Sequence, residues 1–201
     1  MMHIAILTFD GFNELDSLIA LGILNRIKKP GWRVSIASPT EVVRSMNGVV
    51  LRAQDSLADA MKADAVIVGS GMQTREIVRD AMLMSQLKLD PTRQLIGAQC
   101  SGTLIMAKLG ILGDLPACTD LTTKPWVQEA NIAVLDQPFF AQGNIATAGG
   151  CLASQYLACW VIARLVSMEA AQQALHYVAP VGEKEEYISR MTENVEPYLH
   201  S

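Results

Sequence analysis

Residues 95–109 read LIGAQCSGTLIMAKL, and this stretch is the most informative part of the chain. Its first five residues are mostly apolar and predict a short buried strand, and the residues after Ser101 predict a helix. Cys100 therefore lies on a tight turn between strand and helix, where Gly97, Ala98 and Gly102 are as small as a strained elbow requires. Backbone N–H groups at a helix N-terminus lower a thiol pKa and bind an oxyanion, so we interpret Cys100 as a nucleophile.

Strand and helix patterns alternate along the rest of the chain. Residues 42–53 alternate and contain Asn47-Gly48, which predicts a β-hairpin. Asp55 or Ser56 is expected to cap a short helix that ends near Met61, and the part after Gly182 reads as a polar tail. Further strands are expected at residues 3–8, 32–37, 65–68, 117–119, 132–135 and 144–147, and helices at 15–27, 75–88, 151–165 and 169–177. This order predicts the α/β class, with one mostly parallel sheet covered by helices on both faces.

Three turns follow predicted strand ends: Asp10-Gly11, Gly69-Ser70-Gly71 and Gln99-Cys100. Binding sites of open α/β sheets lie beyond the carboxyl ends of the strands, so we expect these turns to meet. The N–H groups of Ser101 and of Gly69-Ser70-Gly71 are the candidate anion cradle.

Composition limits the classes of function. The 201 residues are 50% hydrophobic and 18% charged, which predicts one domain over residues 1–201 with a sizeable core. The net charge of −4 and the absence of basic runs predict neither a nucleic-acid nor a membrane partner. The chain enters its first apolar run at Ile4 without a basic leader, which predicts no signal peptide and a cytoplasmic protein.

The four cysteines form no CxxC pair, and no histidines stand at metal-ligand spacing. We therefore expect neither a metal site nor a disulfide framework. Cys118, Cys151 and Cys159 are interpreted as inert thiols of the core.

A thiolate needs an acid or base beside it, and residues 12–17 offer two carboxylates. Spacing alone does not choose between Glu14 and Asp16. A carboxyl group held against a thiolate has a raised pKa and can share or donate a proton near neutral pH. The histidines argue against a Cys–His pair: His3 starts a strand at the opposite end, His176 is in a late helix and His200 is in the tail.

Four segments resemble the DJ-1/PfpI family of the glutamine amidotransferase-like superfamily: Phe9–Asp16, Ile67–Gly71, residues 98–114 around Cys100, and Ala146–Gly150. The resemblance covers nearly the whole chain and is greatest to the isonitrile hydratase branch, with Leu15-Asp16 in the first loop. It implies a single DJ-1/PfpI-type domain with a flavodoxin-like three-layer sandwich, and a homodimer. It also implies that Asp16, and not Glu14, faces Cys100, and that Ser101 supplies a hydroxyl after the nucleophile.

One departure from the family concerns Asp120, which stands where many members carry a histidine. A carboxylate there repels a thiolate, so peptidase chemistry is disfavoured, and we place Asp120 with Gly69, Ser70 and Gly71 among the oxyanion or substrate-binding residues. Phe12, Trp126, Phe139 and Phe140 are expected to be core or dimer contacts in preference to substrate clamps.

The resemblance implies a cofactor-free hydratase or hydrolase that acts on a small electrophilic molecule, with Cys100, Asp16 and Ser101 as catalytic residues and an N-substituted formamide as product. The alternative is a cysteine protein of the DJ-1 type that senses oxidants or electrophiles without turnover. A ligand-binding module like those of AraC-type regulators is a third hypothesis, which the lack of a helix-turn-helix disfavours.

Overall fold

The computed structural model describes residues 1–199, and a seven-stranded sheet forms its centre. The strand order is β5-β2-β1-β6-β7-β9-β8, and all neighbours are parallel except the antiparallel pair β8–β9. The strands of the sheet are β1 (Met2–Leu7), β2 (Trp32–Ser38), β5 (Asp55–Ser56), β6 (Ala65–Val68), β7 (Leu95–Gln99), β8 (Phe139–Gln142) and β9 (Ile145–Ala148). A separate antiparallel hairpin joins β3 (Val42–Arg44) to β4 (Val50–Arg52).

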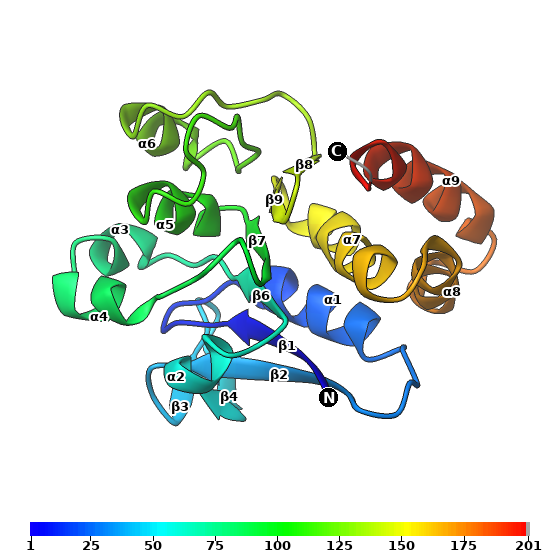
Figure 1. Cartoon of the computed structure of the whole chain (residues 1–201), viewed down its shortest axis with the longest axis horizontal. Helices are drawn as coiled ribbons and strands as arrows, with labels where there is room; N and C mark the ends of the chain where they lie inside the picture. The colour runs from blue at the N-terminus through cyan, green and yellow to red at the C-terminus, as the bar shows by residue number, and fades with distance from the viewer. Residues whose placement is uncertain (200–201) are drawn as a thin grey trace.

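Helices cover both faces of the sheet, as Figure 1 shows. One face carries α1 (Glu14–Leu24), α7 (Ser154–Leu165), α8 (Met168–Val178) and α9 (Lys184–Val195), with the short 3₁₀ helices η1 (Cys151–Ala153) and η2 (Glu196–Tyr198). The other carries α2 (Leu57–Ala60), α3 (Thr74–Ile77), α4 (Ala81–Gln86), α5 (Gly102–Lys108) and α6 (Lys124–Glu129). The result is the expected flavodoxin-like α/β sandwich of three layers with a β-hairpin insertion.

The central strands have apolar side chains on both sides, because both faces of the sheet are covered. Every residue of β6 and β7 is buried. Burial of a large aliphatic side chain stabilises a fold by roughly 1.5–3 kcal/mol, so these short strands position the loops at their ends firmly.

Several local predictions are confirmed. The hairpin turns at Asn47-Gly48, and Ser56 caps α2 through a hydrogen bond from the N–H of Asp59. The predicted strands at 3–8, 32–37, 65–68 and 144–147 correspond to β1, β2, β6 and β9.

Other predictions are wrong. Residues 117–119 and 132–135 are not strands, and only a single bridge joins Ala117 to Val134. The helix expected over 75–88 is two helices, because Asp80 leaves helical geometry and caps α4 instead. The polar tail after Gly182 contains α9, and β8 was not predicted.

Within the described residues 1–199, no helix combines the length and the apolar character that crossing a membrane demands.

Candidate active site

Cys100 occupies a strained elbow between β7 and α5. Its φ is +47°, which is the left-handed region that residues other than glycine seldom adopt. The N–H of Cys100 donates to the carbonyl of Ala148 (2.8 Å), and the hydroxyl of Thr119 donates to the carbonyl of Cys100 (2.8 Å). A Cβ on Gly102 would stand 2.4 Å from the carbonyl oxygen of Val68, so only glycine lets α5 approach the end of β6 this closely.

Asp16 faces this elbow from the first turn of α1. The helix begins there because the side chain of Asn13 accepts a hydrogen bond from the N–H of Leu15 (3.1 Å) and caps it. Asp16 is 1% exposed, and its Oδ2 accepts a hydrogen bond from the hydroxyl of Ser70. Its Oδ1 is buried and has no hydrogen-bond partner among residues 1–199.

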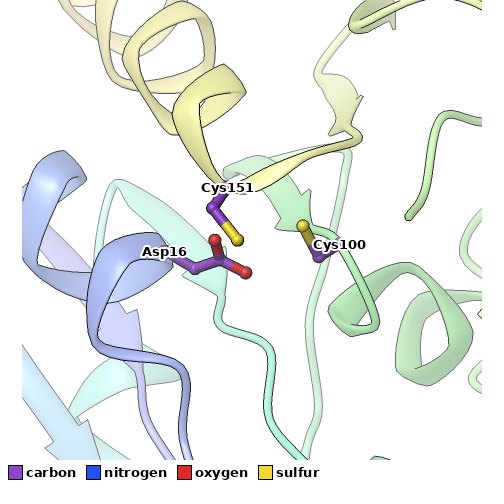
Figure 2. A group of neighbouring side chains, drawn as sticks. All are labelled: Asp16, Cys100 and Cys151. Atoms are coloured by element: carbon purple, nitrogen blue, oxygen red, sulfur yellow. The ribbon is translucent and has the colours of Figure 1, made fainter. Parts of the chain in front are cut away.

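A second thiol completes the cluster. The sulfurs of Cys100 and Cys151 and a carboxylate oxygen of Asp16 all lie within 4.8 Å of one another. Figure 2 shows the carboxyl group and the sulfur of Cys151 directed into the space beside Cys100. Two sulfurs and one oxygen form a donor set that suits a soft ion such as Zn²⁺, so these three residues are also the ones that could hold a metal.

Glu14 has a different task. Its carboxylate accepts hydrogen bonds from the hydroxyl of Ser45 and from the side-chain amide of Asn47 (2.9 Å). Glu14 thus ties α1 to the β3–β4 hairpin, and Asp16 is the carboxylate beside Cys100. This arrangement agrees with the choice that the family resemblance implied.

Burial dominates the electrostatics of the cluster. It raises the pKa of the Cys100 thiol, and the neighbouring Asp16 raises it further. Burial likewise raises the pKa of Asp16, although the hydrogen bond from Ser70 opposes this effect. The expectation that helix amides lower the pKa of Cys100 is therefore wrong, because desolvation and the adjacent carboxylate outweigh them. Both shifts favour the protonated form of the group concerned.

Two of the backbone N–H groups expected to form an anion cradle are already bonded within the protein. The N–H of Gly69 donates to the carbonyl of Leu7 (2.9 Å), and the N–H of Gly71 donates to the hydroxyl of Ser101 (3.1 Å). The N–H groups of Ser70 and Ser101 have no acceptor in the part of the chain that the structure describes.

The hydroxyl of Ser101 bonds to Thr74 (2.7 Å) and not to Cys100. It therefore fastens the start of α5 to the loop after β6.

Asp120 lies at the rim of the site. Its Oδ1 accepts hydrogen bonds from the N–H groups of Thr122 and Thr123 (both 2.9 Å) just before α6. Its negative charge contributes to the raised pKa values of Asp16 and Cys100, though less than burial does.

The histidines do not join the site. His3 pairs with Asp55 (3.1 Å) and bonds to Ser35 (2.8 Å) at the start of β1, and His176 is exposed on α8. His200 lies outside the described residues.

Cys151 is not the core thiol that was expected. Cys151 is partly exposed and follows β9 through Gly149-Gly150, a strand end with small residues like the one that singles out Cys100. That signal could have found it. Cys118 and Cys159 are buried as expected, and burial raises the pKa of Cys118 to about 12.

The aromatic residues form packing contacts. Phe12 and Phe139 are buried, and Phe139 and Phe140 meet Tyr198 with ring centroids 5.8 and 5.4 Å apart. Trp126 stacks under the guanidinium of Arg75 at 4.6 Å. The burial of Phe12 and Phe139 agrees with the core contacts that were expected.

The comparison with family models decides the assignment: the model of the DJ-1/PfpI family matches residues 2–164. The chain belongs to the DJ-1/PfpI family. Within this family, the cluster of Asp16, Cys100 and Cys151 is the candidate active site. No curated protein matches the chain significantly.

Solved structures of DJ-1/PfpI proteins share the fold. A ThiJ/PfpI family protein from Pseudomonas syringae is 17% identical with a TM-score of 0.78, covering 99% of this chain and 89% of its own. DJ-1beta of Drosophila melanogaster is 21% identical with a TM-score of 0.77, over 88% of this chain and 97% of its own. Oxidized DJ-1 of Toxoplasma gondii is 20% identical with a TM-score of 0.75, over 89% and 98%.

Proposed function

We propose that the protein is a cysteine-dependent hydratase that needs no cofactor and converts a small isonitrile to an N-substituted formamide. One observation carries the proposal. A buried carboxyl group with an unpartnered oxygen lies beside the thiol of Cys100, which a strained elbow presents at the carboxyl edge of the sheet. A nucleophile and an acid–base group in this arrangement suit addition to an electrophilic carbon.

The reaction passes protons through the carboxylate of Asp16. Cys100 attacks the isonitrile carbon as its proton passes through Asp16 to that carbon, which gives an enzyme-bound thioimidate. Asp16, again a carboxylate, takes a proton from water as the oxygen adds to the same carbon, and it delivers this proton to the nitrogen. The carbon–sulfur bond then breaks as the hydroxyl of the adduct becomes a carbonyl; the hydroxyl proton passes through Asp16 to the sulfur of Cys100, and the formamide leaves. Water is the only co-reactant: its oxygen and one hydrogen end in the formamide, and its other hydrogen restores the thiol, whose own proton went to the carbon.

The remaining site residues have supporting roles in this proposal. The N–H groups of Ser70 and Ser101, which lack acceptors within residues 1–199, are placed to stabilise the negative charge that develops. Gly69 and Gly71 shape the turn that carries Ser70, and Asp120 limits which substrates enter because its charge repels anions. Cys100 is only 4% exposed, which favours a small and narrow substrate group.

A substrate panel tests the proposal. Wild type, Cys100→Ala and Asp16→Asn would be incubated with alkyl and aryl isonitriles, glyoxals and small amides, and products followed by NMR. We expect formamide from the wild type and a loss of at least about 10³-fold in either variant. Cys118→Ala serves as the matched control, because Cys118 is buried outside the cluster. A wild type that makes no formamide would overturn the assignment.

A second candidate is oxidant or electrophile sensing without turnover, as in the DJ-1-type alternative. The observation that favours it is the pair of thiols beside a carboxyl group, Asp16, whose pKa is raised by burial. Stoichiometric oxidation of the cluster by peroxide, together with no turnover of any panel member, would select this candidate.

Assembly and location are also proposals. We infer a cytoplasmic homodimer, and the exposed Leu15 on α1 and Leu152 on η1, which flank the cluster, are suitable contacts for a second copy. Light scattering of wild type and Leu152→Glu would test the dimer, which we expect the substitution to weaken.

A further inference from the structure

The mechanism proposed above uses Cys100 and Asp16 but leaves the thiol of Cys151 without a task. That thiol is partly exposed, and its sulfur lies within 4.8 Å of the sulfur of Cys100. The carboxyl group of Asp16 belongs to the same cluster, and one of its buried oxygens has no hydrogen-bond partner in the described chain. Asp16 therefore lies beside two thiols, whereas the proposed hydratase mechanism needs only one.

The register of the sheet places the two cysteines together. Strands β7 and β9 are parallel neighbours, and Gln99 pairs with Ala148. Cys100 and Cys151 follow these partners by one and three residues, so both leave the same edge of the sheet side by side. The meeting of the two thiols is thus a property of the central sheet and not of a loose loop.

Two amide side chains hold the sulfurs in place. The amide of Asn13 donates to the sulfur of Cys151 (3.2 Å). The amide of Gln99 donates to the carbonyl of Gly150 (2.9 Å) and contacts the sulfur of Cys100 (3.5 Å). Both thiols are consequently oriented towards the shared space that Figure 2 shows.

We propose that Cys100 and Cys151 form a reversible disulfide when the protein meets a peroxide. Peroxide reaches Cys151 first, because that thiol is the more exposed of the two. The sulfur of Cys151 attacks one peroxide oxygen as its proton passes to Asp16, the O–O bond breaks, and the proton leaves with the other oxygen as water or alcohol. The product is the sulfenic acid of Cys151.

The second step closes the bond. The sulfur of Cys100 attacks the sulfur of Cys151, the S–O bond breaks, and the proton of Cys100 passes through Asp16 to the departing hydroxide, which leaves as water. Two thiols are oxidised to one disulfide while one peroxide is reduced. A dithiol reductant reverses the change by exchange, so the cycle is complete.

The closure requires the two sulfurs to approach each other. The sulfurs lie within 4.8 Å and must reach about 2.05 Å, a change that side-chain rotation provides when the backbone positions suit a disulfide. Gly150, with φ +87° and open space around it, adds freedom just before Cys151. A neighbouring thiol also competes well with a second peroxide molecule from solution, because it is already in place. Disulfide formation therefore prevails over further oxidation to a sulfinic acid.

Peptide mapping tests the disulfide on the unmodified chain. Folded protein would be treated with hydrogen peroxide in the presence of a chelator, alkylated, and digested with trypsin and chymotrypsin, which separate Cys100, Cys118, Cys151 and Cys159 because cleavable residues stand between them. We expect a cross-linked peptide pair that contains Cys100 and Cys151, an intact mass lower by two hydrogen atoms, and full reversal by dithiothreitol.

Matched variants test which cysteine is oxidised first and which one closes the disulfide. In Cys100→Ser, Cys151 is expected to be trapped as a sulfenic acid that dimedone labels. In Cys151→Ser, Cys100 is expected to gain two oxygen atoms, and in Cys118→Ala the disulfide is expected as in wild type. A wild type whose Cys151 stays a free thiol while Cys100 gains oxygen, or one that forms only intermolecular disulfides, would overturn the proposal. None of these readouts needs a substrate, so they stand apart from the proposed hydratase activity.

Discussion

Asp16 accepts a hydrogen bond from Ser70 with one carboxylate oxygen and leaves the other buried without a hydrogen-bond partner in residues 1–199. Ser70 comes from the loop after β6, whereas Asp16 is in the first turn of α1. A carboxylate oxygen of Asp16 also lies in the cluster with Cys100 and Cys151, so the contact from Ser70 fixes the carboxyl group beside the two thiols. A buried acceptor without a partner costs stability, which makes this relationship measurable.

Asp16→Asn is expected to raise stability at neutral pH while it removes activity. Burial raises the pKa of Asp16 in the folded state, so the stability that its proton provides is complete below the unfolded pKa of about 3.9 and is lost as the pH rises through the folded pKa. Asparagine does not titrate, so the variant does not lose stability in this way as the pH rises. We expect its Tm near pH 7 to exceed that of wild type by about 2–4 °C, or about 1 kcal/mol, and the difference to vanish near pH 3.

Glu14→Gln is the matched control for this pH dependence. Hydrogen bonds from Ser45 lower the pKa of Glu14, so its carboxylate stabilises the fold above the unfolded pKa and that stabilisation is lost on acidification. The control is therefore expected to change stability at neutral pH in the opposite direction. Equal thermal shifts in the two variants would contradict the assignment of the two carboxylates.

Ser70→Ala is expected to move the acid limb of the activity profile to higher pH. The hydroxyl of Ser70 lowers the pKa of Asp16, and its removal raises that pKa further, so the cluster retains its protons over a wider range. We expect about a tenfold loss of kcat/KM and a shifted limb in a pH series of formamide formation. Ser101→Ala, whose hydroxyl bonds to Thr74, is expected to leave the limb in place whatever its rate.

The φ of Cys100 predicts an unusual order of stability among substitutions. A left-handed residue with a Cβ is strained, so Cys100→Gly is expected to be more stable than Cys100→Ala by about 0.5–1 kcal/mol in urea unfolding, with neither active. At Cys118, which does not have a positive φ, the order is expected to reverse. If alanine proves the more stable residue at both positions, the elbow at Cys100 is not strained.

Sequence patterns predicted the central sheet well, because parallel strands buried on both faces leave continuous apolar runs. Ala65–Val68 was placed to the residue, and the turns after β1, β6 and β7 were expected at one edge. The strands predicted at 117–119 and 132–135 are absent, because an apolar run shows that a segment is buried but not that a partner strand lies beside it. Helix α9 was overlooked because its residues are mostly polar, although Tyr187, Met191 and Val195 stand at helical spacing and the last two are buried.

Some residues of the candidate site could likewise be predicted from the sequence, and others could not. Cys100 could be predicted from the residues beside it. The choice of Asp16 over Glu14 needed the family resemblance, because the sequence does not show which of the two carboxylates points towards Cys100. Cys151 follows small residues at a strand end, as Cys100 does, but its place beside Cys100 depends on the pairing of β7 with β9, a contact between segments about fifty residues apart. The raised pKa of Cys100 also required the structure, because burial is a property of the whole fold.

Gly102→Ala is expected to destabilise the protein and to displace the nucleophile. The added methyl group would stand 2.4 Å from the carbonyl of Val68 and 2.9 Å from that of Gly69, so α5 must move away from the end of β6 and carry Cys100 with it. We expect a loss of about 2–3 kcal/mol in urea unfolding. Gly22→Ala is the matched control, because Gly22 is in α1 with nothing within 4 Å of the new methyl group. That control is expected to gain about 0.5–1 kcal/mol, since alanine favours helices. Equal urea midpoints for the two variants would show that α5 does not dock against β6 as closely as the structure has it.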